Sequence, residues 1–164
     1  MKTETKTTIT EITHDDLVNL FSTALYGSSY LSVDYTIEDK KSVEVSDDDC
    51  YEDIIAKILL SGKSIEVTDD YAEGCSYGSL PYRFQDKDDD DSSVIYRIAL
   101  DDIKLGLEKA ADGTFNAGDD KWTKQTKSSA RKSFESFMDE DYDFDLVRAD
   151  ILMQIILFDE IIYG

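Results

Sequence analysis

The stretch "FDLVRADILMQIILFDEIIYG", residues 144–164, decides the expected fold, because its apolar residues are spread nearly all round a helix. A surface helix keeps a polar face, whereas a helix that is apolar on every side belongs inside a protein. We therefore expect this C-terminal segment to form a central, buried helix with the remaining elements packed around it.

The residues before this helix alternate between extended and helical patterns. Strands are predicted at 5–12, 30–37, 64–68, 82–85 and 93–100, and we expect 64–68, 82–85 and 93–100 to form an antiparallel meander. Helices are predicted after Thr13, which forms a capping box with Asp16, after Ser46, after Asp101 as far as Gly113, and over 121–138. The prediction is an α+β fold in which about four mostly antiparallel strands pack with four to five helices, in one acidic globular domain over 1–164.

The charge of the chain narrows the choice of partners. Its 37 acidic and 17 basic residues give a net charge of −20 at pH 7. Contacts with nucleic-acid phosphates or anionic lipids need Lys and Arg, so direct binding to nucleic acid or to a membrane is disfavoured. A basic protein partner is favoured instead.

The sequence offers little for catalysis. His14 is the one histidine, and Cys50 and Cys75 are interpreted as free thiols in a reducing compartment. We find no nucleophile elbow, no CxxC pair and no glycine-rich phosphate loop. We therefore expect a protein that is not an enzyme and uses no cofactor.

The expected location of the protein is the cytoplasm. The N-terminus has no apolar segment typical of a signal peptide. The longest apolar stretch, "ILMQIILF" at 151–158, is too short to span a membrane.

An alternative function is calcium binding by residues 139–150. Asp139, Asp141 and Asp143 match positions 1, 3 and 5 of an EF-hand loop, and Asp150 stands at position 12. Position 6, which needs a glycine, is Phe144. The simpler interpretation is that Asp143 or Asp145 caps the last helix. A metal-dependent hydrolase is a further alternative, which needs carboxylates from distant segments to converge.

One segment reverses the general charge. It contains Lys121, Lys124, Lys127, Arg131 and Lys132 with no acidic residue between them. Either neighbouring carboxylates balance these charges within the chain, or the segment forms a second contact surface.

Acidic residues occur in runs at 47–49, 69–70, 86–91 and 139–145. Helix caps and turns explain some of them, but no cap requires four consecutive aspartates. Carboxylates held several ångströms apart resemble the phosphates of a nucleic-acid strand, which are spaced by roughly 7 Å, about two 3.4 Å rises. The predicted partner-binding residues are Asp86, Asp88, Asp89, Asp90, Asp91, Asp139, Glu140, Asp141, Tyr142, Asp143 and Asp145, and we expect Tyr142 and Phe144 to add aromatic anchors.

In size, charge and aspartate runs the chain resembles the acidic DNA-mimic inhibitors of phages and mobile elements, which include anti-CRISPR and anti-restriction proteins. This resemblance implies inhibition of a basic nucleic-acid-binding protein, such as a CRISPR effector or a restriction enzyme, through mimicry of phosphates. The basic segment at 121–132 departs from a uniformly acidic mimic.

Overall fold

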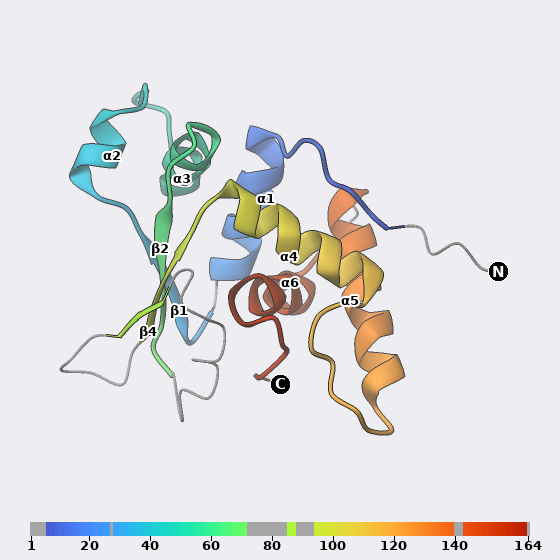
Figure 1. The fold of residues 1–164 in the computed structure, drawn as a ribbon. Coiled ribbons are helices and arrows are strands. Elements are labelled where there is room, and N and C mark those ends of the chain that lie inside the picture. Colours follow the sequence, from blue (N-terminus) through green and yellow to red (C-terminus); the bar gives the residue numbers. More distant parts are fainter. Residues whose placement is uncertain (1–5, 27, 72–84, 88–93, 140–142, 164) are drawn as a thin grey trace.

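The computed structural model describes residues 6–26, 28–71, 85–87, 94–139 and 143–163. Over these residues the helices are α1 His14–Leu25, α2 Ile37–Lys41, α3 Tyr51–Leu60, α4 Leu100–Asp112, α5 Thr123–Met138 and α6 Leu146–Phe158, and the strands are β1 Leu31–Asp34, β2 Ile65–Asp69, β3 Gln85–Lys87 and β4 Val94–Ile98 (Figure 1). The predicted α+β class with an antiparallel sheet is confirmed. The six helices of the described residues exceed the predicted four to five.

The sheet consists of three strands of four or five residues, β1, β2 and β4, with the three-residue β3 along the outer edge of β4. All neighbours are antiparallel, and β4 lies between β2 and β3. The predicted meander is therefore wrong in its order. The connection between β2 and β3, residues 70–84, is far longer than a hairpin turn, so it does not force these two strands to be neighbours.

The predicted first strand, 5–12, is also wrong over its described residues. Thr7 and Ile9 donate their backbone N–H groups to the side chains of Asp112 and Glu108 on α4, at 2.9 Å each. The segment runs along α4 with Ile9 and Ile12 buried, and no strand pairs with it in the described part of the chain. The β-branched residues of this segment suit its packing on α4 as well as they would suit a strand. Their alternating pattern alone therefore predicted a strand wrongly.

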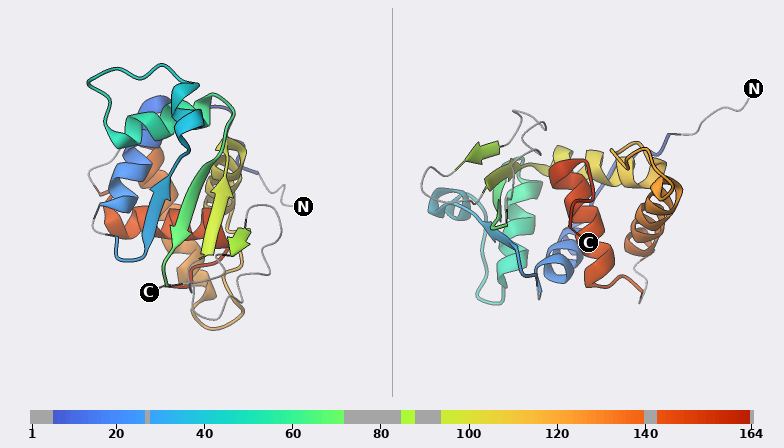
Figure 2. Two further views of the ribbon diagram at one scale, coloured as in Figure 1. Left: turned by 90° about the vertical axis from the view of Figure 1, so that its left-hand side faces the viewer. Right: turned by 90° about the horizontal axis from the view of Figure 1, so that it is seen from below.

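One face of the sheet is covered by helices (Figure 2). Alternate side chains of β1, β2 and β4 point into the core and are buried, including Leu31, Val67 and Tyr96. Residues between them, such as Ser32 and Arg97, are exposed. This alternation is the usual one for an antiparallel sheet with one face turned to a core.

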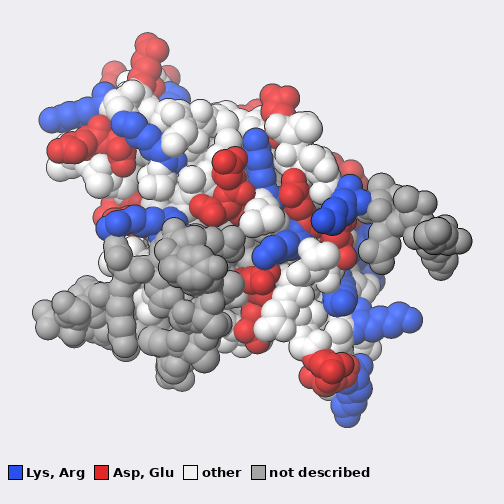
Figure 3. Space-filling view, in the orientation of Figure 1, with Lys and Arg blue, Asp and Glu red and all other residues white. Residues whose placement is uncertain are grey.

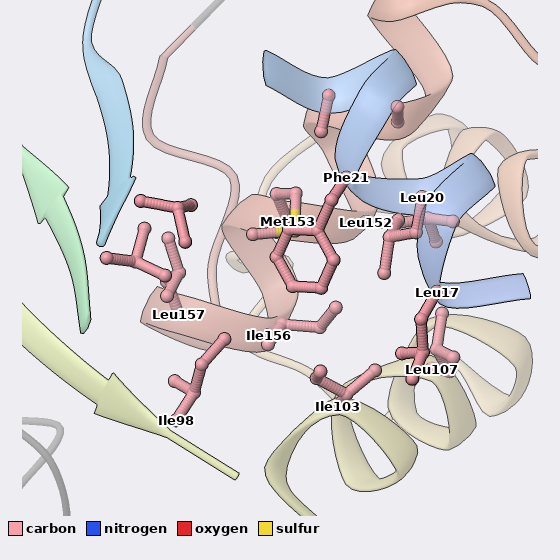
Figure 4. Packing of buried hydrophobic residues seen from close by; sticks show 14 of the residues in the cluster. Leu17, Leu20, Phe21, Ile98, Ile103, Leu107, Leu152, Met153, Ile156 and Leu157 are labelled. Atoms are coloured by element: carbon pink, nitrogen blue, oxygen red, sulfur yellow. The ribbon is translucent and has the colours of Figure 1, made fainter. Parts of the chain in front are cut away.

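Helix α6 is central, as predicted, because every residue from Leu152 to Phe158 is buried. It packs against α1, α4 and α5, and Figure 4 shows Met153 and Ile156 among side chains from α1, α4 and β4. Gly106 permits the contact with α4, since a methyl group there would lie 2.5 Å from Cγ1 of Ile156 and 2.7 Å from its Cα.

Some of the helices begin and end where the sequence predicted, and others do not. The capping box of Thr13 with Asp16 and the left-handed Gly113 after α4 are confirmed. Helix α3 begins at Tyr51 and not after Ser46, because the Asp49 carboxylate accepts from the Ser46 N–H and closes a separate turn. Two further predictions were wrong in their bounds. The strand predicted at 30–37 ends at Asp34, and Thr36 then caps α2, a helix that was not predicted. The N-cap of α4 is Ala99 and not Asp101.

None of the helices in the described residues is long and apolar enough to cross a membrane.

Candidate functional site

The predicted partner-binding residues are only partly described. Asp86 is in the edge strand β3, whereas Asp88 to Asp91 and 140–142 lie outside the described residues. Asp139 and Asp143 are exposed at the connection between α5 and α6. Asp145 is the N-cap of α6 and accepts from the Arg148 N–H at 3.0 Å, as the simpler interpretation of this loop predicted.

Two residues of the predicted acidic surface turn inward. Phe144 is buried and its ring lies 5.3 Å from that of Phe137, so it is a core residue and not an aromatic anchor. Asp69 is completely buried and accepts from the Tyr163 hydroxyl and the Tyr71 N–H, at 2.9 Å each. The run at 69–70 therefore contributes only Asp70 to the surface.

The arrangement around Asp150 does not match a calcium loop. Its carboxylate is half-buried and accepts from the hydroxyl of Tyr30 and from the Gln154 amide at 2.7 Å. Among the described residues, no group of three His, Cys, Asp or Glu side chains is placed to hold a metal ion. The convergence that the hydrolase alternative requires is thus not found in the part of the chain that the structure describes.

The acidic surface that the structure does describe is the segment 34–53, here called the acidic lobe. It runs from the end of β1 through α2 to the first turn of α3, and contains nine Asp and Glu against two Lys. Lys57 of α3 fastens it, because its ammonium donates to the Glu44 carbonyl at 2.8 Å and to the Asp49 carboxylate at 2.5 Å. Asp47 and Asp48 are thereby presented to solvent at the tip of a fixed turn.

The acidic lobe also carries apolar groups. Ile37, Val45 and Tyr51 are exposed, and the Tyr51 ring lies 5.0 Å from that of Tyr35. The Tyr51 hydroxyl donates to the Val33 carbonyl at 2.5 Å, and partial burial together with the nearby Asp34 raises its pKa to about 12. The lobe thus combines carboxylates with an aromatic pair, and of these two it is the aromatic residues that are enriched at protein interfaces.

Cys50, Asp53 and His14 lie together at the start of α3. Nε2 of His14 is 2.8 Å from the Asp53 carboxylate, which also accepts from the Cys50 N–H at 3.0 Å and from its thiol at 3.1 Å. These bonds, the one from His14 foremost, lower the pKa of Asp53 to about 2. The bond to Asp53 raises the pKa of the Cys50 thiol, the opposite of what a nucleophile needs. The cluster joins α3 to α1, and in the described contacts the His14 ring and the Cys50 thiol each bond to Asp53 and not to one another.

The basic residues of the predicted segment lie on or next to α5 and are exposed (Figure 3). Arg131 pairs with Glu135 at 3.0 Å, and the Lys121 ammonium stands over the Trp122 ring at 5.1 Å from its centroid. Within the described residues, Lys124, Lys127 and Lys132 have no ion pair. Among the described residues, Arg131 is thus the one member of this segment with an ion pair, and the face in Figure 3 carries both signs of charge.

A groove of about 880 Å³ lies between α5 and α6, and we call it the tyrosine groove. Helix α5 contributes Gln125, Thr126 and Ser129 together with its N-cap residue Trp122, and α6 contributes Leu146, Val147, Asp150 and Ile151. The remaining lining comes from Ser28 to Tyr30 before β1, from Tyr71 after β2, and from residues 161–163 after α6. Segments that are far apart in the sequence, from Ser28 to Tyr163, therefore meet here.

Buried hydrogen bonds hold the floor of this groove. Gln154 accepts from the N–H groups of Ile162 and Tyr163, at 2.7 and 2.8 Å, and donates to the Tyr163 carbonyl at 3.0 Å. The Tyr163 ring packs 4.5 Å from that of Tyr30. Burial, and then the bond to Asp150, raises the pKa of Tyr30 well above its usual range, so its hydroxyl stays a proton donor. The groove is consequently preformed.

Sequence reasoning missed the tyrosine groove. Its lining residues are spread from Ser28 to Tyr163, and no short motif connects them. The sequence did show the apolar pair Leu146 and Val147 in the first turn of the last helix. This helix was predicted to be buried, but both residues are exposed in the structure. Comparison of the chain with models of protein families, with curated proteins and with solved structures finds no match.

Proposed function

We propose that the protein is a non-enzymatic acidic binding protein that inhibits a basic nucleic-acid-binding protein, such as a bacterial defence nuclease, by placing carboxylates where phosphates would bind. The observation that supports this most is the turn at Ser46 to Asp49, which Lys57 fastens so that Asp47 and Asp48 project into solvent. Fixed charges lose little conformational freedom on binding and attract an oppositely charged partner over a distance.

The acidic lobe extends this surface. Glu38 and Glu44 are further exposed carboxylates of the lobe, and the Tyr35–Tyr51 pair adds aromatic surface to it. The net charge of −20 adds general attraction for a basic groove. The exposed Asp139, Asp143 and Asp145 are retained as further contacts in this proposal.

The test is capture from nuclease-treated bacterial lysate at low and high salt, followed by competition with duplex DNA. We expect a nucleic-acid-binding protein that is released by salt and displaced by DNA. The variant Asp47→Lys with Asp48→Lys should lose at least about tenfold in affinity for it, since each reversal removes an attraction worth of order 1 kcal/mol.

A matched control separates this surface from overall charge. Asp101→Lys with Asp119→Lys reverses two exposed aspartates elsewhere and changes the net charge equally. Equal weakening by both double variants, or capture that DNA does not displace, would contradict the mimicry proposal.

A further inference from the structure

Exposed apolar side chains gather along the tyrosine groove and continue beyond it. Val147 is 66% exposed and Trp122 is 55% exposed, and both line the groove. Leu146 lines the groove and also a second hollow beside it, whose wall includes Tyr26, which is 86% exposed. We call the groove and this hollow together the apolar face. Apolar side chains that gather in this way, instead of being scattered singly, mark a surface that another molecule covers.

The apolar face has the size of an interface between two proteins. Fifteen described residues line the groove, and five more line the hollow. A standard protein interface uses about 20 to 30 residues on each side. The bonds from Gln154 to the segment that ends at Tyr163 fix the floor, so a partner loses little affinity to the ordering of this surface.

The rim of the apolar face along α5 is basic. The exposed Lys and Arg residues of 121–132 lie on this helix or next to it. Lys121 stands over the ring of Trp122. Lys132 continues the groove-lining row that includes Ser129, because it follows that residue by three positions on a helix. A cationic ligand would therefore meet like charges along this rim.

The rim on the far side of α6 is acidic. Figure 2 shows α5 on one side of α6 and α1 on the other, and both helices pack against α6. Glu52 lines the hollow beside the end of α1, and Asp70 is exposed next to Tyr71, which lines the groove. The Asp70 N–H donates to the Tyr30 carbonyl at 2.9 Å, which holds this segment at the groove wall. An anionic ligand would meet like charges along this rim.

Two rims of opposite sign suit a second copy of the same chain. In a contact with two-fold symmetry, the residues on one side of the axis face those on the other side in the partner copy. With the axis over α6, the basic rim of each copy lies against the acidic rim of the other, and the two apolar faces cover each other. The net charge of −20 permits this contact, because at physiological ionic strength charges more than about 8 Å apart are largely screened.

We propose that the apolar face is the interface of a symmetric dimer, in which a second copy of the chain covers it. Charge complementarity between the rims selects this occupant, and the apolar surface between the rims supplies most of the affinity. The interface borders the acidic lobe at Glu52, whereas Asp47 and Asp48 line neither the groove nor the hollow. The dimer does not rest on phosphate mimicry.

Sedimentation equilibrium of the full chain gives the first test, at concentrations up to about 1 mM, the weakest affinity on the usual scale. We expect a reversible dimer. The emission of Trp122, the one tryptophan of the chain, should shift to the blue and become protected from acrylamide as the dimer forms. A single-chain mass at every concentration would overturn the proposal. Shielding of Trp122 in the monomer would also overturn it, since another part of the chain would then cover the face.

Two matched variants locate the interface. Val147→Asp puts a charge within the covered apolar surface and should weaken the dimer at least about tenfold. Val147 is in the first turn of α6, where a negative charge is favourable, so this variant should fold. Ile37→Asp adds the same charge in the first turn of α2, where Ile37 is 72% exposed, and should leave the dimer unchanged. Equal effects of the two variants would contradict this assignment.

Exchange of charge between the rims tests the symmetry. Lys121→Glu with Lys132→Glu makes both rims acidic, and Glu52→Lys with Asp70→Lys makes both rims basic. Each double variant alone should dimerise at least about tenfold more weakly, because like charges then face each other. An equimolar mixture should recover the dimer, since the two chains present opposite charges across both rims. No recovery in the mixture, with both variants folded by their melting curves, would show that the rims do not meet and overturn the proposal.

The dimer and phosphate mimicry can fail independently. Asp47→Lys with Asp48→Lys should dimerise like the parent, because neither residue lines the apolar face. A monomer that still captures a salt-released nucleic-acid-binding protein would remove the dimer alone. A dimer that captures no such protein would support this interface and remove mimicry alone.

Discussion

The acidic lobe and the tyrosine groove differ in what holds them. The lobe is fixed by bonds between near neighbours in sequence, such as Ser46 with Asp49 and Asp49 with Lys57. The groove depends on contacts between distant parts of the chain, such as Tyr30 with Asp150 and Asp69 with Tyr163. The acidic surface of the lobe can therefore form from one short segment, whereas the tyrosine groove forms only when distant segments of the chain have folded together.

The largest effect is expected in the core, where α4 packs against α6. Gly106→Val would place side-chain atoms against the backbone of Ile156 and push α6 away from α4. We expect a loss of about 3 kcal/mol in the free energy of unfolding, the upper part of the range for overpacked cores. Urea denaturation measures it, with Leu105→Ala on the exposed side of α4 as the control. A Gly106→Val variant as stable as the parent would show that the two helices can separate freely.

The next effect concerns the groove wall alone. Gln154→Leu leaves the N–H groups of Ile162 and Tyr163 without their acceptor, and we expect a loss of about 2 kcal/mol for these unsatisfied groups. Hydrogen exchange should show that residues 161–163 are released. The control is Gln125→Leu, an exposed position on the same groove. Binding through the acidic lobe should persist, and its loss would mean that the two regions are coupled.

A smaller effect is expected at Asp53, whose bond with His14 links the acidic lobe to α1. The Asp53 pKa of about 2 lies below its ordinary 3.8, so this group contributes stability above about pH 4 that is lost as the pH falls toward 2. Asp53→Asn should lower the melting temperature at pH 7, by the equivalent of about 1 kcal/mol for a lost helix cap. The difference between variant and parent should shrink in acid. Parallel melting curves from pH 7 to pH 2 would contradict this role of Asp53.

The smallest effect on stability belongs to the charges proposed to bind. Asp47→Lys with Asp48→Lys should change the free energy of unfolding by less than about 0.5 kcal/mol, because both side chains are exposed and make no described hydrogen bond. Thermal denaturation at low and high salt measures this. A large loss of stability would show that these carboxylates serve the fold, and weaker capture of a partner would then need a different explanation.

The parts of the fold that could be predicted depend on periodicity and local caps. The apolar pattern of 152–158, interrupted only by Gln154, predicted the buried α6. Thr13, Asp16 and Gly113 predicted helix ends, since each acts within a few residues. The order of the strands could not be predicted, because nothing local shows that β4 lies between β2 and β3.

The candidate sites divide in the same way. Runs of aspartate are visible in a sequence, but burial is not, so Asp69 looked like a surface residue although it accepts from Tyr163 in the interior. No short motif marks the tyrosine groove in the sequence, because its walls come from segments that only the folded chain brings together.

The attachment of residues 161–163 by Gln154 has a practical consequence for handling the protein. Whatever is joined after Tyr163, whether a purification tag or a fused reporter, leaves the molecule from the wall of the tyrosine groove. Immobilisation through that end would turn the groove toward the support and hide it from ligands in solution. Screening surfaces should therefore hold the protein by its N-terminal side.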